Sequence, residues 1–379
     1  MSATPISVSR LTLTDFRNYA RHTLETDARP VVLTGANGAG KTNLLEAVSL
    51  LVPGRGLRRA SFETLARAGG SGGWAVAAEV DGLLGNVRIG TGIEAGQTGS
   101  ARSVRIEREP SPVTALGDHV AALWLTPAMD GLFTGPSSDR RRFLDRLTVA
   151  LEPGHAAQTA RFEKLMRQRN KLLDAERPDA RWLDAVETEM AGAGVAVAAA
   201  RRETVVRLSA TQADRGSDDL FPAFAIVIEG ELEAALEETS ATAVEDSYRE
   251  QLAAMRRQDA AAGRTLAGPH RSDLAVTHLG KGIAAALAST GEQKALLIGL
   301  TLAHADIVSR AEGRERPPIL LLDEIAAHLD DLRRAALYER LLDLECQAWM
   351  TGTDRALFTA ISDAAQLFEI AGGMVQPWD

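Results

Sequence analysis

The stretch that decides the fold is Gly35-Ala36-Asn37-Gly38-Ala39-Gly40-Lys41-Thr42. It follows the apolar run at residues 30–34 and precedes a helix-like stretch at residues 43–48. A strand that enters a glycine-rich turn and then a helix directs several backbone N–H groups to one point, where the helix dipole adds partial positive charge. The glycines let the chain curl without Cβ clashes. The pattern therefore predicts a phosphate-binding loop whose ligand is a polyphosphate.

Two side chains at the end of this stretch have predicted chemical roles. Lys41 is expected to reach the β- and γ-phosphates and to act in catalysis, and Thr42 is expected to offer its hydroxyl to Mg²⁺. The alternative is a chance glycine-rich turn before a helix; the flanking strand and helix favour the loop. The residues that this pattern predicts to bind the polyphosphate are Gly35, Ala36, Asn37, Gly38, Ala39, Gly40, Lys41, Thr42 and Asn43.

Length, charge and cysteine content limit the class of protein. A chain of 379 residues exceeds the size at which a single core stops growing, so we expect a main domain and a second lobe. The formal net charge of −9 argues against a surface that is basic throughout, so any nucleic-acid contact must come from local basic clusters. The one cysteine, Cys346, cannot form an internal disulfide, and the first residues do not resemble a secretory signal, which predicts a cytoplasmic location. No apolar run approaches the roughly 20 residues that cross a bilayer, so membrane attachment would need a partner.

The first part of the chain has the pattern of short strands. Residues 6–33 and the runs 74–80, 83–89 and 103–107 alternate between apolar and polar positions, and glycine pairs separate them. They predict a small antiparallel sheet, with a loop over residues 90–100.

The middle and the end of the chain differ in periodicity. Residues 137–262 have helical spacing, interrupted by strand character only at 221–228. The last third returns to an α/β pattern, with a predicted helix at 295–308 and predicted strands at 274–279, 318–322, 346–351, 367–370 and 374–376. We therefore expect residues 1–136 and 263–379 to form one nucleotide-binding head, and residues 137–262 to form an inserted, mainly helical lobe.

A second acidic motif completes the predicted nucleotide chemistry. Residues 319–324 read as a buried parallel strand that ends in Asp323 and Glu324, at the sheet edge where ligands of α/β folds bind. Asp323 is predicted to hold Mg²⁺, and Glu324 to polarise the water that attacks the γ-phosphate. The alternative is an acidic strand end that caps the next helix; the loop at 35–42 favours the catalytic interpretation.

The order of the motifs resembles that of the ATP-binding-cassette (ABC) ATPases. A serine at a helix start is by itself usually only an N-cap. In this family, however, a signature serine and glycine of one subunit close over the γ-phosphate held by another. The resemblance implies a signature that acts in trans at Ser289, Gly291, Glu292 and Gln293, and a following D-loop with His328 and Asp330.

The spacing distinguishes branches of that family. The interval of 247 positions from Thr42 to Ser289 exceeds that of a transporter ATPase and contains the predicted helical lobe. A split head is similar to that of the chromosome-maintenance and DNA-repair branch, although the chain lacks a sustained heptad pattern for a long coiled coil. The resemblance implies the fold class α/β: an ABC-type P-loop ATPase head, with a mixed sheet, flanking helices and an antiparallel subdomain, plus an inserted compact helical lobe.

Within this branch the chain resembles the RecF family over almost its entire length. The motifs that carry the resemblance are residues 13–19, 35–47, 135–136 with 140–145, 169–170 before 172–173, and 268–273. The resemblance implies an ATP- and Mg²⁺-dependent homodimer that binds DNA, both double-stranded and at single-strand junctions and gaps. It also implies assistance to RecO and RecR in loading RecA during gap repair and SOS induction, with hydrolysis resetting the clamp. Arg17, in the first of these motifs, is implied to lie beside the nucleotide.

Three residues depart from the family pattern. Thr290 and Glu292 replace the glycine and glutamine common in cassette signatures, and Thr353 stands where many cassette ATPases have a γ-phosphate-sensing histidine. Threonine contacts phosphate without the field of a cation. We therefore expect slow ATP hydrolysis. Weak stimulation of this hydrolysis by DNA is a separate expectation.

Clusters of arginine are the candidates for DNA contact, because phosphate contacts need no sequence readout. The alternative for each arginine is a solvated helix face or an intramolecular ion pair. The turn at Gly268-Pro269 could project His270 and Arg271 into a site, or it could simply join a helix to a strand. Three other functions also remain open: another short SMC-like ATPase of DNA metabolism, a small-molecule kinase or ordinary nucleoside-triphosphatase, and a scaffold that binds ATP without hydrolysing it. The candidate DNA contacts are Arg55, Arg58, Arg59, Arg140, Arg141 and Arg142, and the cations of the predicted helix at 161–171.

Overall fold

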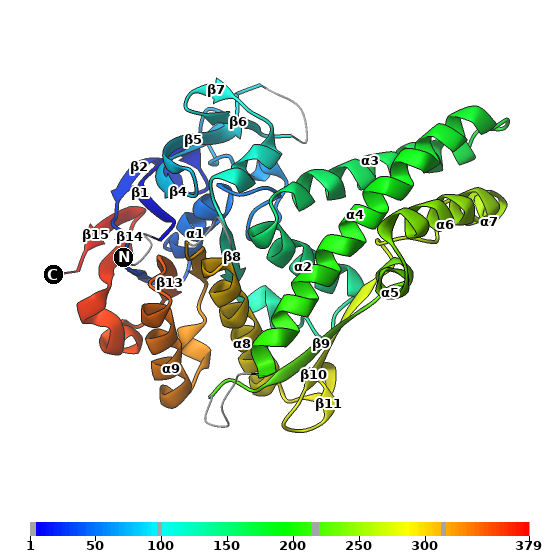
Figure 1. Cartoon of the computed structure of the whole chain (residues 1–379). Helices are drawn as coiled ribbons and strands as arrows, with labels where there is room; N and C mark the ends of the chain where they lie inside the picture. The colour runs from blue at the N-terminus through cyan, green and yellow to red at the C-terminus, as the bar shows by residue number, and fades with distance from the viewer. Residues whose placement is uncertain (1–4, 97–100, 214–219, 312–315, 379) are drawn as a thin grey trace. The chain divides into compact units, whose positions relative to one another are not determined.

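The computed structural model describes residues 5–96, 101–213, 220–311 and 316–378 (Figure 1). The chain divides into two compact units, which we describe separately. Unit 1 comprises Met1–Asp130, Ser217–Pro222 and Thr290–Asp379, and unit 2 comprises Gly131–Gly216 and Ala223–Ser289.

The centre of unit 1 is a six-stranded, mainly parallel sheet. Its inner strands are apolar and buried along their whole length, as expected where both faces of a parallel sheet are covered. In spatial order its strands are β15 (Met374–Pro377), β14 (Gln366–Ala371), β3 (Val31–Thr34), β13 (Ala348–Gly352), β12 (Ile319–Leu322) and β8 (Ala122–Leu125). Only β15 runs antiparallel to its neighbour. The α-helices of unit 1 are α1 (Lys41–Ser49), α8 (Thr290–Ser309) and α9 (Asp331–Asp343) in the part of the chain that the structure describes.

The sheet confirms the strands predicted around residues 30–34, 318–322 and 346–351 and the C-terminal hairpin. It also contains β8, which sequence analysis missed. Four apolar residues in a row do not distinguish a strand from a helix, and β8 is specified by its parallel pairing with β12, almost 200 residues further along the chain.

A second, antiparallel sheet completes unit 1 and confirms the predicted antiparallel subdomain. Its strands alternate between buried and exposed positions, as in the pattern of β4, because only one face of the sheet meets the core. In spatial order they are β2 (Tyr19–Glu25), β1 (Ser7–Phe16), β4 (Trp74–Gly82), β5 (Gly85–Ile93), β6 (Ser103–Ile106) and β7 (Glu109–Pro110). The loop predicted at 90–100 starts too early, since β5 continues to Ile93; residues 97–100 lie outside the described part.

Unit 2 is mainly helical. Its long helix α4 packs against α3 and α6, and small residues along α4 permit the close approach: a Cβ on Gly194 would lie 2.9 Å from the Tyr248 ring. The helices are α2 (Ser137–Leu151), α3 (Gly154–Leu173), α4 (Ala180–Ala213), α5 (Glu231–Glu238), α6 (Ala241–Ala254) and α7 (Arg256–Ala262). Their apolar faces meet in one core that includes Phe162, Met190 and Leu252.

Unit 2 also has a small sheet, which corrects one predicted domain boundary. The strands β9 (Phe224–Glu229), β10 (Asp273–His278) and β11 (Ile283–Ala284) form it in the order β11-β10-β9. Residues 263–289, which we expected in the ATPase head, therefore belong to unit 2, because β10 pairs with β9 along its whole length.

Short 3₁₀ helices connect the larger elements. They are η1 (Phe62–Leu65), η2 (Val113–Asp118), η3 (Pro127–Met129), η4 (Ala285–Leu287), η5 (Ala326–His328) and η6 (Arg355–Ala364). Within the ranges given above, no helix has both the length and the apolar character needed to span a membrane.

Candidate nucleotide-binding site

The predicted phosphate-binding loop lies where β3 ends and α1 begins, at the carboxyl edge of the parallel sheet. Residues 36–38 are exposed at its tip. Gly40 forms the N-cap of α1 in a left-handed conformation (φ +118°), and no side chain caps the helix. The first N–H groups of α1 are thus available to an anion, as the sequence predicts.

Two of the loop glycines are required by close packing. A Cβ on Gly35 would lie 2.3 Å from the carbonyl oxygen of Ile370, and a Cβ on Gly40 would lie 2.7 Å from the Tyr19 hydroxyl. Tyr19 donates a hydrogen bond to the Gly40 carbonyl (3.2 Å), and Asn18 donates one to the Ala39 carbonyl (3.2 Å). Asn18 and Tyr19 lie in the motif at residues 13–19, for which the sequence predicted no role in supporting the loop.

The Lys41 ammonium group is buried in the concave side of the loop. Its Nζ donates to the carbonyl oxygens of Gly35 (2.7 Å) and Ala36 (3.1 Å) and lies 3.4 Å from Glu324 Oε1. All three partners are acceptors. The ammonium group is therefore placed where a phosphate oxygen can exchange with any one of them.

Thr42 and Asp323 meet, although 281 residues separate them in sequence. The Thr42 hydroxyl donates to Asp323 Oδ1 at 2.8 Å. A hydroxyl and a carboxylate side by side are the hard oxygen donors that Mg²⁺ prefers, and protein Mg²⁺ sites usually add substrate phosphates to one or two carboxylates. This donor pair therefore fits a cation that completes its coordination with triphosphate oxygens. No group of three or more His, Cys, Asp or Glu side chains suited to a metal occurs in the described ranges.

Glu324 has an unusual backbone. Its φ of +55° lies in the left-handed region, which costs a non-glycine residue about 1–2 kcal/mol. Its N–H donates to the Thr351 hydroxyl (2.8 Å), which in turn donates to Asp323 Oδ1 (2.9 Å). Sequence analysis missed Thr351, because nothing local distinguishes a threonine in a buried strand from an ordinary core position.

Arg17 has protein partners near the loop. Its guanidinium group makes a two-point ion pair with buried Glu46 on α1 (2.8 and 2.9 Å) and a hydrogen bond to the Thr64 carbonyl (3.1 Å). Contact between Arg17 and a nucleotide stays a prediction.

The predicted signature residues lie at the start of α8. Ser289 and Gly291 are exposed, Glu292 is half-buried and Gln293 is buried. Helix α8 packs against β8, the edge strand, whereas the phosphate-binding loop follows β3, with β13 and β12 between them.

The remaining predicted nucleotide-site residues have simpler surroundings. Asp330 is the N-cap of α9, where its side chain accepts the Arg333 N–H (2.9 Å), and His328 is exposed at the end of η5. Thr353 is exposed just after β13.

The arginines predicted to contact DNA fall into two groups. Arg55 and Arg59 are exposed in unit 1. Arg58 is also exposed, and it donates to the Asn43 amide oxygen (2.7 Å) and lies 3.4 Å from Glu46.

In unit 2 the three arginines of α2 have intramolecular partners. Arg140 forms a two-point ion pair with Asp273 (2.7 Å for both bonds), which raises the pKa of Arg140 and lowers that of Asp273. Arg141 donates to the Ser272 carbonyl (2.6 Å), and Arg142 pairs with Asp139. The alternative of intramolecular pairing thus describes all three, and DNA contact by them stays a prediction.

The motif at 268–273 connects elements of unit 2. His270 Nε2 lies 3.0 Å from the Thr265 carbonyl oxygen, and burial lowers the pKa of His270. Ser272 donates to the buried Glu233 carboxylate (2.8 and 2.9 Å). These contacts favour a structural role for His270, while Arg271 is exposed.

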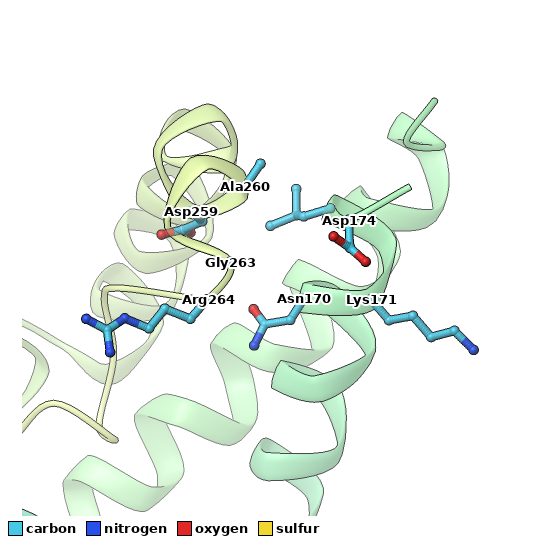
Figure 2. Close-up of a pocket in the computed structure, with 8 residues that line it drawn as sticks. Asn170, Lys171, Asp174, Asp259, Ala260, Gly263 and Arg264 are labelled. Atoms are coloured by element: carbon cyan, nitrogen blue, oxygen red, sulfur yellow. The ribbon is translucent and has the colours of Figure 1, made fainter. Parts of the chain in front are cut away.

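A cavity of about 360 Å³ lies between the ends of α3 and α7 in unit 2 (Figure 2). The cations Lys171 and Arg264 point away from it in Figure 2, and the Asn170 amide oxygen and the Asp259 carboxylate have protein partners. This lining does not suit a phosphate, so the cavity is not a second nucleotide site. Its lining residues are Asn170, Lys171, Leu173, Asp174, Asp259, Ala260, Gly263 and Arg264.

Known proteins are similar to this chain along nearly its whole length. The model of the RecF/RecN/SMC N terminal domain matches residues 7–376. The chain is 54% identical to a DNA replication and repair protein RecF of Rhizobium etli over 98% of both chains, and 53% identical to one of Mesorhizobium japonicum over 98% of this chain and 97% of that one.

Two solved structures show the same fold at low sequence identity. A structure of the recombination mediator protein RecF-ATPrS in the RecFOR pathway superposes with a TM-score of 0.85 at 20% identity and covers both chains fully. The Smc head domain of Pyrococcus furiosus, with an extended coiled coil, gives a TM-score of 0.54 at 15% identity over 98% of this chain and 95% of that one.

Proposed function

The chain belongs to the RecF family, and from that premise we propose that it acts as an ATP-dependent DNA-binding recombination mediator. It is a DNA replication and repair protein with an ABC-type ATP-binding fold. The observation that carries the proposal is the convergence of Lys41, Thr42, Asp323 and Glu324 at one edge of the parallel sheet. A phosphate-binding loop without such carboxylates would bind a nucleotide but would lack groups to hydrolyse it.

Each residue of the site has a different role in the proposed hydrolysis. Lys41 transfers its N–H groups from the carbonyls of Gly35 and Ala36 to phosphate oxygens, and this also releases Glu324. Glu324 then orients and polarises the attacking water. Thr42 and Asp323 would hold Mg²⁺, which supplies charge neutralisation for the phosphoryl group.

We propose that ATP joins two copies of the chain. The exposure of Ser289 and Gly291 and the packing of α8 on the edge strand β8 favour a signature that serves the loop of a second copy. Thr353 is exposed and its side chain carries no positive charge to offer the γ-phosphate, which supports slow hydrolysis. We propose in addition that DNA stimulates this hydrolysis weakly. In this proposal ATP binding closes the dimer on DNA, and hydrolysis reopens it.

The proposed partners follow the relatives. In the cytoplasm the dimer would bind single-strand gaps and their duplex junctions and assist RecO and RecR in loading RecA, in gap repair and SOS induction. The cations that best support a DNA contact are Arg55, Arg58 and Arg59. They lie near the phosphate-binding loop in sequence, and they are exposed, so a DNA phosphate can reach them.

The mass of the protein in solution tests the dimer. Light scattering should report a monomer without nucleotide and a dimer with ATP and Mg²⁺. Ser289→Arg should abolish the dimer while leaving ATP binding by the monomer intact, whereas Lys41→Arg should weaken ATP binding itself. Glu324→Gln should accumulate the dimer, because the closed state is no longer hydrolysed. If the wild type binds ATP and stays monomeric, the proposal is contradicted and an ordinary nucleoside-triphosphatase or kinase is favoured. If Glu324→Gln forms and loses the dimer as the wild type does, a scaffold that does not hydrolyse ATP is favoured.

The salt dependence of DNA affinity tests the arginine contacts. Each lost phosphate contact should reduce the slope of log K against log salt by about one. We expect a reduction of about two for Arg58→Ala/Arg59→Ala and none for Arg310→Ala, an exposed arginine just after α8 that pairs with Asp306 of that helix. Equal slopes for all three proteins would exclude Arg58 and Arg59 from the DNA contact.

A further inference from the structure

Thr351 lies at the carboxyl end of β13, the strand between the one that enters the phosphate-binding loop and the one that carries the two carboxylates. We propose that Thr351 is a positioning residue for ATP hydrolysis, whose single hydroxyl sets the orientation of both Asp323 and Glu324. The inference rests on the proposed ATPase function and assigns to this residue a task that the phosphate-binding loop and the carboxylates leave open.

The two partners of the Thr351 hydroxyl determine in which hydrogen bond it accepts and in which it donates. The Glu324 N–H can only donate, so Thr351 Oγ1 accepts there (2.8 Å). The hydroxyl hydrogen is then free to donate to Asp323 Oδ1 (2.9 Å), and an ionised carboxylate can only accept. The side chain is 1% exposed, so water does not replace either bond.

Asp323 depends on this bond once a cation is bound. Its Oδ1 accepts from both Thr42 (2.8 Å) and Thr351 (2.9 Å). Thr42 is also the hydroxyl that would serve as a cation ligand, and its lone pairs and hydrogen would then reorient. The Thr351 bond is the one that holds the Asp323 carboxylate in place throughout, as partners behind a metal ligand commonly do.

Glu324 depends on Thr351 through its backbone. Successive N–H groups of a strand point to opposite neighbours. The Asp323 N–H bonds to the Leu125 carbonyl of β8 (2.9 Å), and the Glu324 N–H, on the β13 side, bonds to the side-chain hydroxyl of Thr351 (2.8 Å). This bond holds the N–H of a residue whose φ of +55° is left-handed. A strained backbone persists only where its surroundings hold it, and here it directs the Glu324 carboxylate toward Lys41 (3.4 Å).

The test uses three variants. Thr351→Val keeps the shape and β-branching but removes the hydroxyl, Thr351→Ser restores a hydroxyl, and Thr301→Val is the matched control. Thr301 is also buried in unit 1, but its hydroxyl donates to the Leu297 carbonyl of its own helix, α8 (2.8 Å), and, among the described residues, to no group of the nucleotide site. The measurements are kcat and KM for ATP, and the Mg²⁺ concentration that half-saturates the binding of a fluorescent ATP analogue.

For Thr351→Val we expect kcat to fall by about 10- to 100-fold with KM within about threefold, and the half-saturating Mg²⁺ concentration to rise by about 10-fold or more. Thr351→Ser should recover most of both, and Thr301→Val should change neither. An unchanged kcat in Thr351→Val, a failure of Thr351→Ser to recover, or an equal loss in Thr301→Val would overturn the proposal. If Thr351→Val does not fold, Thr351→Cys takes its place, because a thiol is of similar size and a weak hydrogen-bonding group.

The two levels of inference fail separately. A wild type without ATP turnover contradicts the proposed ATPase and leaves the Mg²⁺ dependence of nucleotide binding as the measure of Thr351. A wild type that hydrolyses ATP, with Thr351→Val unaltered in both measurements, contradicts only the role of Thr351.

Discussion

Arg169 is fully buried in unit 2, and its removal provides a demanding test of how that unit is held together. Its guanidinium group donates to Glu187 (2.9 Å), Asp259 (2.6 Å), the Thr265 hydroxyl (2.9 Å) and the Leu252 carbonyl (2.7 Å). Arg169, Glu187 and Asp259 are each at most 1% exposed. Four elements of unit 2 therefore meet at a single charge.

Arg169→Met preserves much of the side-chain volume and removes that charge. Breaking a buried ion pair from one side costs about 3–5 kcal/mol, because the remaining charge is left uncompensated. Glu187 retains Arg256 as a second cation (3.1 Å), whereas Asp259 keeps only a backbone hydrogen bond, from Leu266 (3.0 Å). One uncompensated carboxylate instead of two places the expected loss at the lower end, about 3 kcal/mol.

Hydrogen exchange followed by mass spectrometry resolves the two units within one chain, so the measurement does not require the whole protein to unfold in one step. A loss of about 3 kcal/mol corresponds to roughly a hundredfold faster exchange in peptides from α3, α4 and α7. Peptides from the parallel sheet of unit 1 serve as the internal reference. Arg167→Met is the matched control on the same helix: its pair with Glu163 is more than half exposed at both ends and should contribute at most about 1 kcal/mol.

The single variant Arg169→Met leaves the Asp259 carboxylate buried without a cation, and the double variant Arg169→Met/Asp259→Asn also removes this negative charge. We expect it to lose less stability than the sum of the two single variants, because the two side chains share one interaction. Equal exchange in Arg169→Met and Arg167→Met, or strictly additive losses in the double variant, would refute the reasoning that the buried charge organises unit 2.

Two further outcomes follow from single positions. Gly35→Ala should destabilise unit 1 by about 2 kcal/mol or more in chemical denaturation, because the added Cβ would meet the Ile370 carbonyl oxygen at 2.3 Å. Gly38→Ala is the control: its φ is also positive but no atom lies within 4 Å of the added Cβ, so it should cost only about 1 kcal/mol. Equal losses of stability in the two variants would contradict the steric argument. Burial raises the pKa of Asp145, but Arg201 and His155 outweigh it and lower the pKa from 3.8 to about 2. The stability that this carboxylate contributes is therefore present above pH 3.8 and lost as the pH falls toward 2. In hydrogen exchange of unit 2, the stability advantage of wild type over Asp145→Asn should shrink by about 2 kcal/mol between pH 5 and pH 2. A difference that stays constant over this range would contradict the lowered pKa of Asp145.

Much of the nucleotide site was predictable from sequence because its parts are local. The loop at 35–42 needs glycines, a lysine and a threonine at consecutive positions, and the strand that ends in Asp323 and Glu324 needs only an apolar run before two carboxylates. These requirements involve neighbours in the chain, so a single sequence displays them. The apolar periodicity likewise predicted the antiparallel sheet and the helices of the middle segment.

Other features depended on partners that lie far away in sequence. The sequence of β10 reads as a strand in either unit, and only its pairing with β9 assigns residues 263–289 to unit 2. Arg169 reads as a surface cation on a helix, and only the approach of Glu187 and Asp259 makes it a buried centre.

The division has one physical reason. Covalent neighbours determine the backbone turn that exposes N–H groups and the strand end that carries the carboxylates, so the sequence alone predicted which residues are proposed to face the nucleotide. Side-chain orientation depends on atoms that folding brings together, such as the Thr351 hydroxyl between Asp323 and the Glu324 N–H. Only the tertiary structure decided how the two carboxylates are held, because a hydrogen bond between residues almost 30 positions apart leaves no periodic or local pattern in the chain.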